Sequence, residues 1–168
     1  MTRTDTRAAL LIFVIGLATI LGAWGFQLIG GYLPCKLCLE ERVPYYVGLP
    51  LVFVALASSL AGVPPWIART ALALAAIVFL YGAYLGTYHA GAEWSWWEGP
   101  SDCGATGAPI GGAGDLLDSL KNIRIVSCSE ASWRFPDAPW GPSFAGWNAV
   151  ISLLLAAVAA FGATRKSM

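Results

Sequence analysis

The amino-acid sequence predicts an all-α integral membrane protein, a four-helix bundle with two loops on one side of the membrane. The chain of 168 residues is 57% hydrophobic and only 12% charged, with a mean hydropathy of +0.64. This composition differs strongly from that of a soluble globular protein. Four apolar runs each reach the roughly 20 residues that a helix needs to cross a bilayer. Most charged residues lie between these runs or at their ends.

The four runs lie at about 8–29, 43–61, 68–88 and 144–163. Because a backbone in hydrocarbon has to satisfy its own hydrogen bonds, we expect these runs to be helices, packed as a single domain over 1–168. The first run is longer than the apolar core of a signal peptide, which has about 7–15 residues, and no convincing small-residue cleavage site follows it. We therefore interpret it as a retained helix.

The distribution of positive residues predicts the topology. The chain ends and the turn after the second run carry five of them: Arg3, Arg7, Arg69, Arg165 and Lys166. The loop at about 30–42 has two, and nine of the ten acidic residues lie in this loop and the long one at about 89–143. Positive residues favour the cytoplasmic side. We expect a multi-pass protein of the bacterial inner membrane, with both termini cytoplasmic and both loops periplasmic.

The first loop contains a Cys-x-x-Cys pair, Cys35 and Cys38, directly after a helix-breaking Gly-Gly-Tyr-Leu-Pro segment. If the second helix begins within this motif, Cys38 and Arg42 share a helix face, and Cys38 lies near the positive end of the helix dipole. Both effects favour the thiolate, which is the reactive form. Two neighbouring acids, Glu40 and Glu41, oppose thiolate formation if they lie close to Cys38.

Further features are expected in the second and third helices. Pro50 predicts a kink, which is either a simple bend or the opening of a slot beside the cysteines. Gly82 and Gly86 have the spacing of small residues that lets two membrane helices approach closely. His89 ends the third run, where it is either an interfacial residue making hydrogen bonds or a contact for a ligand.

The long second loop carries Cys103 and Cys128. Between them, leucines and an isoleucine recur at helical spacing over Asp115–Val126, which predicts a short amphipathic helix in the membrane interface. That helix would hold Cys128 near the lipid while Cys103 stays mobile. Six of the eight tryptophans lie between Trp94 and Trp147, as expected of an aromatic belt at one membrane surface.

The predicted topology places all four cysteines on the oxidising side of the membrane, where disulfides persist. Four cysteines allow three pairings, and the sequence does not choose among them. A structural zinc site would need four ligands in close pairs. Cys103 and Cys128 are widely spaced and have no histidine beside them, so we expect no metal. Thiol–disulfide exchange needs an attacking thiolate, a resolving partner and access, and two pairs on adjacent loops offer these. The alternative is a non-catalytic membrane scaffold with structural loop disulfides. Zero net charge and the lack of a basic tract argue against nucleic acid as a partner.

The motif Cys35-x-Leu37-Cys38-x-x-Glu41-Arg42 follows a first span in a chain with four spans and a second cysteine pair. Together with Trp147-Asn148 at the entry to the fourth span, this pattern resembles the bacterial disulfide bond formation protein B (DsbB) family over nearly the whole chain. Vitamin K epoxide reductase relatives also join four helices to a quinone, but their Cys-x-x-Cys follows the loop pair, whereas here it comes first.

The resemblance implies a quinone-dependent thiol oxidase that serves a periplasmic thioredoxin-like protein of the DsbA type. It implies that Cys103 accepts the attack of this partner, that Cys128 resolves the mixed disulfide, and that the electrons pass to Cys35 and Cys38. Cys38 would donate them to a bound ubiquinone or menaquinone. Arg42 would stabilise the thiolate and the charge that develops on the quinone, and His89 corresponds to a family histidine near the quinone.

Overall fold

The computed structural model describes residues 4–100, 124–125, 127–136 and 141–165. It contains four long helices, one short helix and two short strands: α1 (Thr4–Leu28), β1 (Tyr32–Leu33), α2 (Lys36–Glu40), α3 (Val43–Leu60), α4 (Pro65–Glu93), β2 (Arg124–Ile125) and α6 (Phe144–Thr164). Four helical segments are long and apolar enough to cross a membrane, with α2 and α3 together forming one of them. The predicted all-α architecture with four membrane-spanning helices is confirmed, and the chain is a multi-pass membrane protein.

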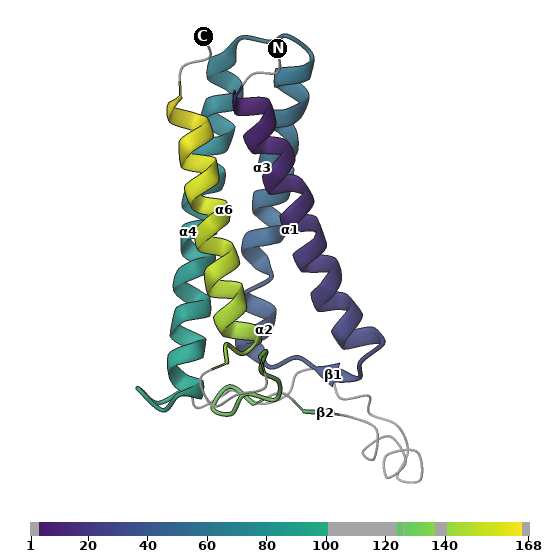
Figure 1. Ribbon diagram of the computed structural model, residues 1–168, viewed down its shortest axis with the longest axis vertical. Coiled ribbons are helices and arrows are strands. Elements are labelled where there is room, and N and C mark those ends of the chain that lie inside the picture. The colour runs from purple at the N-terminus through teal and green to yellow at the C-terminus, as the bar shows by residue number, and fades with distance from the viewer. Residues whose placement is uncertain (1–3, 101–123, 126, 137–140, 166–168) are drawn as a thin grey trace.

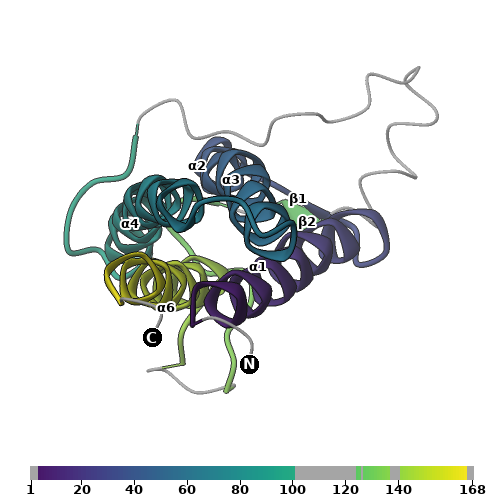
Figure 2. The ribbon, with the colours of Figure 1, turned by 90° about the horizontal axis from the view of Figure 1, so that it is seen from above.

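The long helices surround a common axis, as Figure 2 shows in a view along the bundle. α4 packs against α3 and α6, and α1 closes the bundle by packing against the same two helices. α1 leans away from the other helices toward its C-terminal end (Figure 1). The start of α1 and the end of α6 lie at one end of the bundle, and α2, β1 and β2 lie at the other.

The bundle is held together by close packing of small and large apolar residues. Because lipid tails are as apolar as the helices, membrane helices associate mainly through van der Waals contact, which favours small residues at the interfaces. A Cβ atom on Gly48 would lie 2.7 Å from Cζ of Phe79, and one on Gly86 would lie 2.7 Å from the backbone nitrogen of Ala149. One on Gly82 would lie 3.1 Å from Cβ of Pro44. The predicted role of Gly82 and Gly86 in close helix packing is confirmed.

The second membrane-spanning segment is interrupted where the sequence did not indicate it. A break lies at Glu41 and Arg42, between α2 and α3. α3 continues as one helix through Pro50, and the kink there stays a prediction. Arg42 caps the start of α3, and Pro44 lies in its first turn, where a missing N–H is tolerated. This turn separates the two cysteines from the rest of the span.

The two loops meet through a two-residue parallel pairing, with Tyr32 opposite Arg124 and Leu33 opposite Ile125. The predicted amphipathic helix over Asp115–Val126 is therefore wrong at Arg124–Ile125, because these residues pair their backbone with β1. The remainder of that predicted helix lies outside the described residues. Cys35 follows shortly after β1, and Cys128 follows shortly after β2 (Figure 1).

Candidate functional site

Cys35 is positioned by the start of α2. It is the N-cap residue, with extended backbone (φ −75°, ψ 173°), and its Sγ accepts a hydrogen bond of 3.2 Å from the backbone N–H of Cys38. An N-cap side chain normally receives such a bond from the second or third residue of the helix. The side chain of Cys35 is fully buried. A sulfur in this position faces the unpaired N–H groups of the helix, which stabilise negative charge.

The sequence assigned this electrostatic benefit to Cys38, and the structure corrects the assignment. Because α2 begins at Lys36, its N-terminal N–H groups point at Cys35. The two sulfurs lie 2.7 Å apart, and both cysteines are free thiols. The pKa of the Cys35 thiol is lowered from its ordinary value of 9.0 to about 5, chiefly because Cys38 donates a side-chain hydrogen bond to the Cys35 sulfur. His89 adds to this effect and burial opposes it. The surroundings of Cys35 therefore favour its thiolate form.

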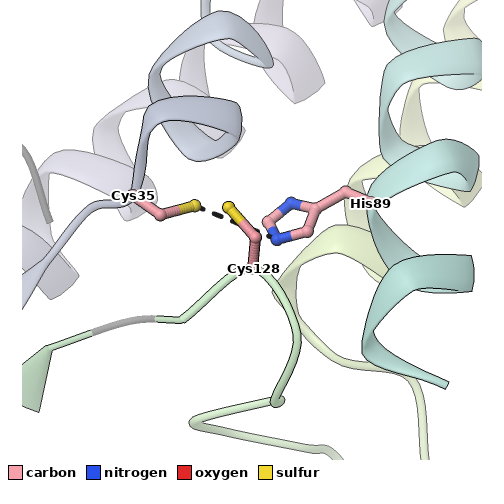
Figure 3. A group of neighbouring side chains, drawn as sticks. All are labelled: Cys35, His89 and Cys128. Carbon is pink, nitrogen blue, oxygen red and sulfur yellow. Dashed lines mark hydrogen bonds between the residues drawn. The ribbon is translucent and has the colours of Figure 1, made fainter. Parts of the chain in front are cut away.

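His89 approaches the cysteines from α4. Its Nε2 atom lies 3.9 Å from Sγ of Cys35, and the side chain is only 2% exposed. Figure 3 shows the imidazole directed toward the sulfur atoms from the opposite side of the site. The ring makes buried contacts with Glu41 and Cys35 and lines the cavity described below, and its contact with a ligand stays a prediction.

Glu41 holds the imidazole in place. Its Oε1 lies 2.7 Å from Nδ1 of His89, and its Oε2 accepts a 3.0 Å hydrogen bond from Nδ2 of Asn148. Asn148 in turn accepts a 2.8 Å hydrogen bond from the hydroxyl group of Tyr45, which also contacts Oγ of Ser152 at 3.1 Å. This network connects α3, α4 and α6 behind the cysteines and fixes the position of each polar group.

The two acids beside the motif therefore behave differently from each other. Glu40 is exposed, whereas Glu41 is buried and engaged by His89 and Asn148. The expectation concerned Cys38, and the negative charge of Glu41 does oppose a thiolate on that residue. For Cys35, Glu41 orients the imidazole whose contact favours the charged form.

Cys128 completes the cluster from the second loop. It is 2% exposed and disulfide-bonded, and the partner in that disulfide lies outside the described residues, as does Cys103. Its Sγ, the Sγ of Cys35 and a ring nitrogen of His89 all lie within 4.8 Å of one another. Figure 3 shows the side chains of Cys35, Cys128 and His89 turned toward one another. The structure thus brings together three of the predicted site residues from three separate segments.

A cavity of about 340 Å³ lies next to the cysteines, between α1 and α6. Its wall is mostly apolar, and Cys38, Arg42 and His89 all line it. An aromatic cluster surrounds the end nearest the loops: Phe26, Tyr32, Trp133 and Phe144. Cys35 is not among the lining residues, so that of the two free thiols only Cys38 faces the cavity.

Arg42 is fixed at the wall of this cavity. Its Nη1 donates a 2.6 Å hydrogen bond to Oε1 of Gln27, and its guanidinium lies 5.5 Å from the centre of the Trp24 ring. The side chain is 8% exposed. The spacing predicted that Cys38 and Arg42 share one face of a helix. A turn rather than one continuous helix connects them, and both line the cavity.

A second buried carboxyl group also lines the cavity. Glu93, one helical turn after His89, accepts a hydrogen bond from Oγ of Ser143, the N-cap residue of α6. The sequence did not single out Glu93, Tyr45 or Ser152. The available signal was the presence of polar groups within or at the end of apolar runs, which in membrane helices usually face the bundle interior.

These positions define what the site can do. Cys35 contacts the free thiol of Cys38 on one side and the disulfide-bonded Cys128 on the other. A low-pKa thiolate next to a disulfide is the arrangement that thiol–disulfide exchange requires. The cluster can pass a disulfide between the two loops, and Cys38 connects it to the cavity.

Comparison of the chain with curated proteins and with solved structures gave no match. The family model described as disulfide bond formation protein DsbB matches residues 5–162, which is nearly the whole chain. This match agrees with the resemblance carried by the Cys-x-x-Cys motif and the order of the spans. The chain belongs to the DsbB family, a family of membrane oxidoreductases of disulfide bond formation.

Proposed function

We propose that the protein is a quinone-dependent thiol oxidase of the bacterial inner membrane. It reoxidises a periplasmic thioredoxin-like protein of the DsbA type and passes the electrons to ubiquinone or menaquinone. One observation carries this proposal: the free dithiol of Cys35 and Cys38 lies between the disulfide-bonded Cys128 and the cavity, with one sulfur directed to each.

The cavity suits a quinone ring. Small-molecule sites are mostly apolar clefts of about 300–1,000 Å³ with a few placed polar groups, and this one has about 340 Å³. Aromatic and aliphatic side chains provide the walls, while Arg42, held by Gln27, provides a fixed hydrogen-bond donor for a carbonyl oxygen. A bound quinone supplies an acceptor for two electrons and two protons.

The cysteines perform the exchange without any other oxidant. A thiolate of the reduced partner attacks Cys103, and Cys128 leaves as a thiolate. Cys128 then attacks Cys35 of a Cys35–Cys38 disulfide, forming a Cys35–Cys128 bond and releasing Cys38 as a thiolate. The partner's second thiolate then releases Cys103, and Cys103 attacks Cys128 of the Cys35–Cys128 bond and releases Cys35. The partner is oxidised, the second loop again holds a disulfide and the Cys-x-x-Cys pair holds two thiols, so the two electrons have moved from the partner to that pair.

Cys38 and Arg42 would act at the cavity. Cys38 faces it and gives up the electron pair, after which Cys35 closes the disulfide over the 2.7 Å that separate the two sulfurs. The guanidinium of Arg42 stabilises negative charge on this thiolate and on the acceptor, as preorganised charges do in a site that excludes water. His89 lies against Cys35 and also lines the cavity, where it can hold or release a proton.

The membrane orientation follows from the same proposal. The described cysteines lie at the end of the bundle opposite the start of α1 and the end of α6 (Figure 1). Together with the positive residues near both chain ends, this supports cytoplasmic termini and a periplasmic dithiol.

The test is quinone reduction by the purified protein with a reduced thioredoxin-like substrate. We expect turnover in the wild type and at least a thousandfold loss in Cys38→Ser, because no other described thiol faces the cavity. Ser58→Ala, at the opposite end of α3, serves as the matched control and should leave turnover unchanged. Turnover that survives Cys38→Ser would contradict the proposal, and a non-catalytic scaffold would show no quinone reduction in any variant.

A further inference from the structure

The cluster of Cys35, His89 and Cys128 has a second chemical property besides exchange. Its two sulfur atoms and one ring nitrogen lie within 4.8 Å of one another, with Sγ of Cys35 3.9 Å from Nε2 of His89. All three side chains are at most 2% exposed. In a tetrahedral zinc site, with Zn–S of about 2.3 Å and Zn–N of about 2.0 Å, neighbouring ligand atoms lie about 3.5–3.8 Å apart. Small side-chain movements would bring this set to that geometry.

The surroundings of His89 resemble the outer shell of a metal site. Nδ1 of the imidazole contacts the carboxylate of Glu41 at 2.7 Å, which leaves Nε2 directed at the sulfur atoms. Metal-binding histidines usually donate their second ring N–H to a carboxylate or carbonyl group, which orients the ring and increases its basicity. The second oxygen of Glu41 is itself held by Asn148 at 3.0 Å. The orientation is therefore fixed before any ion enters.

The sequence could not indicate this set. Cys35, His89 and Cys128 are far apart along the chain. The expectation of no metal rested on the wide spacing of the second cysteine pair and the lack of a histidine beside it. The close approach arises because α4 brings His89 to the start of α2 and because the β1–β2 pairing brings in the second loop.

The oxidation state controls whether the three ligands are available. Cys128 is disulfide-bonded, and a sulfur in a disulfide does not provide the thiolate that a metal needs. Reduction of that disulfide by two electrons and two protons gives two thiols, one of them Cys128. Two thiolates and one neutral imidazole then balance the charge of a divalent ion, so that a buried complex carries no net charge from this set.

We propose that reduction of the second-loop disulfide turns Cys35, His89 and Cys128 into a buried binding site for Zn²⁺. Thiolate and imidazole ligands select zinc over the harder divalent cations, which prefer oxygen. Binding displaces the protons that these three ligands carry in the metal-free form and oxidises nothing. The ion holds both sulfurs as thiolate ligands, so neither can attack a disulfide while the ion is bound. Zinc is thus an inhibitor specific to the reduced form, which goes beyond the proposed oxidase function.

The experiment measures Zn²⁺ binding directly. The full-length protein in detergent, stripped of quinone, is reduced anaerobically with a phosphine, which does not compete for zinc as a dithiol would. Zinc affinity is obtained by competition with a chromophoric chelator, and Co²⁺ replaces zinc to report the ligands through its thiolate charge-transfer absorption. We expect one ion per reduced chain and about hundredfold weaker binding to the oxidised chain, because a metal site needs all its thiolates. Equal affinity for both forms would overturn the proposal.

Variants distinguish this site from the Cys-x-x-Cys pair alone. Cys128→Ser and His89→Ala should each lose the tight binding, whereas Cys38→Ser should retain it within tenfold. Glu41→Gln should weaken it by about 10–100-fold, the usual effect of removing an outer-shell partner. The opposite pattern, with binding lost in Cys38→Ser and kept in Cys128→Ser, would show that the Cys35–Cys38 pair holds the ion and would refute the assignment. Thermal unfolding of each variant without zinc separates a lost ligand from a lost fold.

The measurement is independent of the oxidase assay, since it uses neither quinone nor partner protein. Zinc binding with the expected variant pattern supports the site even if quinone reduction fails. Conversely, an active oxidase whose reduced form binds no zinc leaves the proposed function intact and removes this inference.

Discussion

The carboxylate of Glu41 lies 2.7 Å from Nδ1 of His89 in a buried contact that joins the end of α2 to α4. The other ring nitrogen is thereby directed at Cys35. A single acidic residue thus links the Cys-x-x-Cys segment to the helix that supplies the histidine, and the electrostatics of the thiolate depend on it.

The first prediction concerns this contact. Glu41→Gln removes the negative charge that supports a positive imidazole, so His89 stabilises the Cys35 thiolate less and the pKa of Cys35 rises from about 5 toward its ordinary 9.0. The check is a pH titration of the thiolate ultraviolet absorbance in reduced, quinone-free protein. Glu40→Gln is the control, because Glu40 is exposed whereas Glu41 is buried. An unchanged titration in Glu41→Gln would show that the imidazole charge is irrelevant.

The second prediction concerns the hydrogen bond from Cys38, which contributes most to the lowered pKa of Cys35. Cys38→Ala removes the donor and should raise that pKa, whereas Cys38→Ser keeps an O–H donor and should raise it less. In the same titration, the wild type should hold the thiolate down to about pH 5. If the serine and alanine variants titrate together, another interaction sets the pKa.

The same shift makes the stability of the reduced protein depend on pH. The pKa of Cys35 in the folded chain, about 5, is below its ordinary value of 9.0. Between these values the unfolded chain binds more protons at this site, so stability rises with pH. The contribution is fully present above about pH 9 and is lost as the pH falls through 5. Denaturant unfolding of reduced wild type should show this rise, and Cys35→Ala should show a weaker one.

The fourth prediction uses two glycines of α1. A Cβ atom at Gly22 or at Gly25 would meet nothing within 4 Å, but only Gly22 lines the cavity. Gly22→Leu should therefore occupy space next to a bound ring and raise the KM for quinone about tenfold or more, since each 1.4 kcal/mol of lost contact is a factor of ten. Gly25→Leu should leave the KM unchanged. Steady-state kinetics with a water-soluble quinone analogue measures both, and equal effects would place the quinone elsewhere.

Much of the fold could be predicted because its causes are local. Span length, glycine spacing and the separation of charges follow directly from the order of the residues, and they predicted four helices and the close contacts of Gly82 and Gly86. The break between α2 and α3 was missed because Glu41 and Arg42 are not helix breakers. Their turn is stabilised by contacts with His89, Asn148 and Gln27, which lie far away in the sequence.

The sequence predicted which residues form the candidate site better than it predicted how they are arranged. The cysteines and Arg42 stand in a recognisable motif, but which sulfur accepts the backbone N–H of Cys38 depends on where α2 begins. That start is set by the Gly-Gly-Tyr-Leu-Pro segment together with the β1–β2 pairing, a contact between loops about 90 residues apart in the sequence. The β1–β2 pairing also brings Cys128 close to Cys35, so this proximity could not be predicted from the sequence of either loop alone.

The last prediction tests the network behind the cysteines. Asn148→Ala removes both the amide donor to Glu41 and the acceptor for the Tyr45 hydroxyl group. A buried carboxylate oxygen that loses its partner costs about 1–3 kcal/mol. Tyr45→Phe should cost less, about 0.5–1.5 kcal/mol, because Asn148 keeps its bond to Glu41. Reversible unfolding in mixed micelles measures both variants and the double variant. Because the two residues share a hydrogen bond, their effects should not be additive, and strict additivity would mean that Asn148 and Tyr45 act independently.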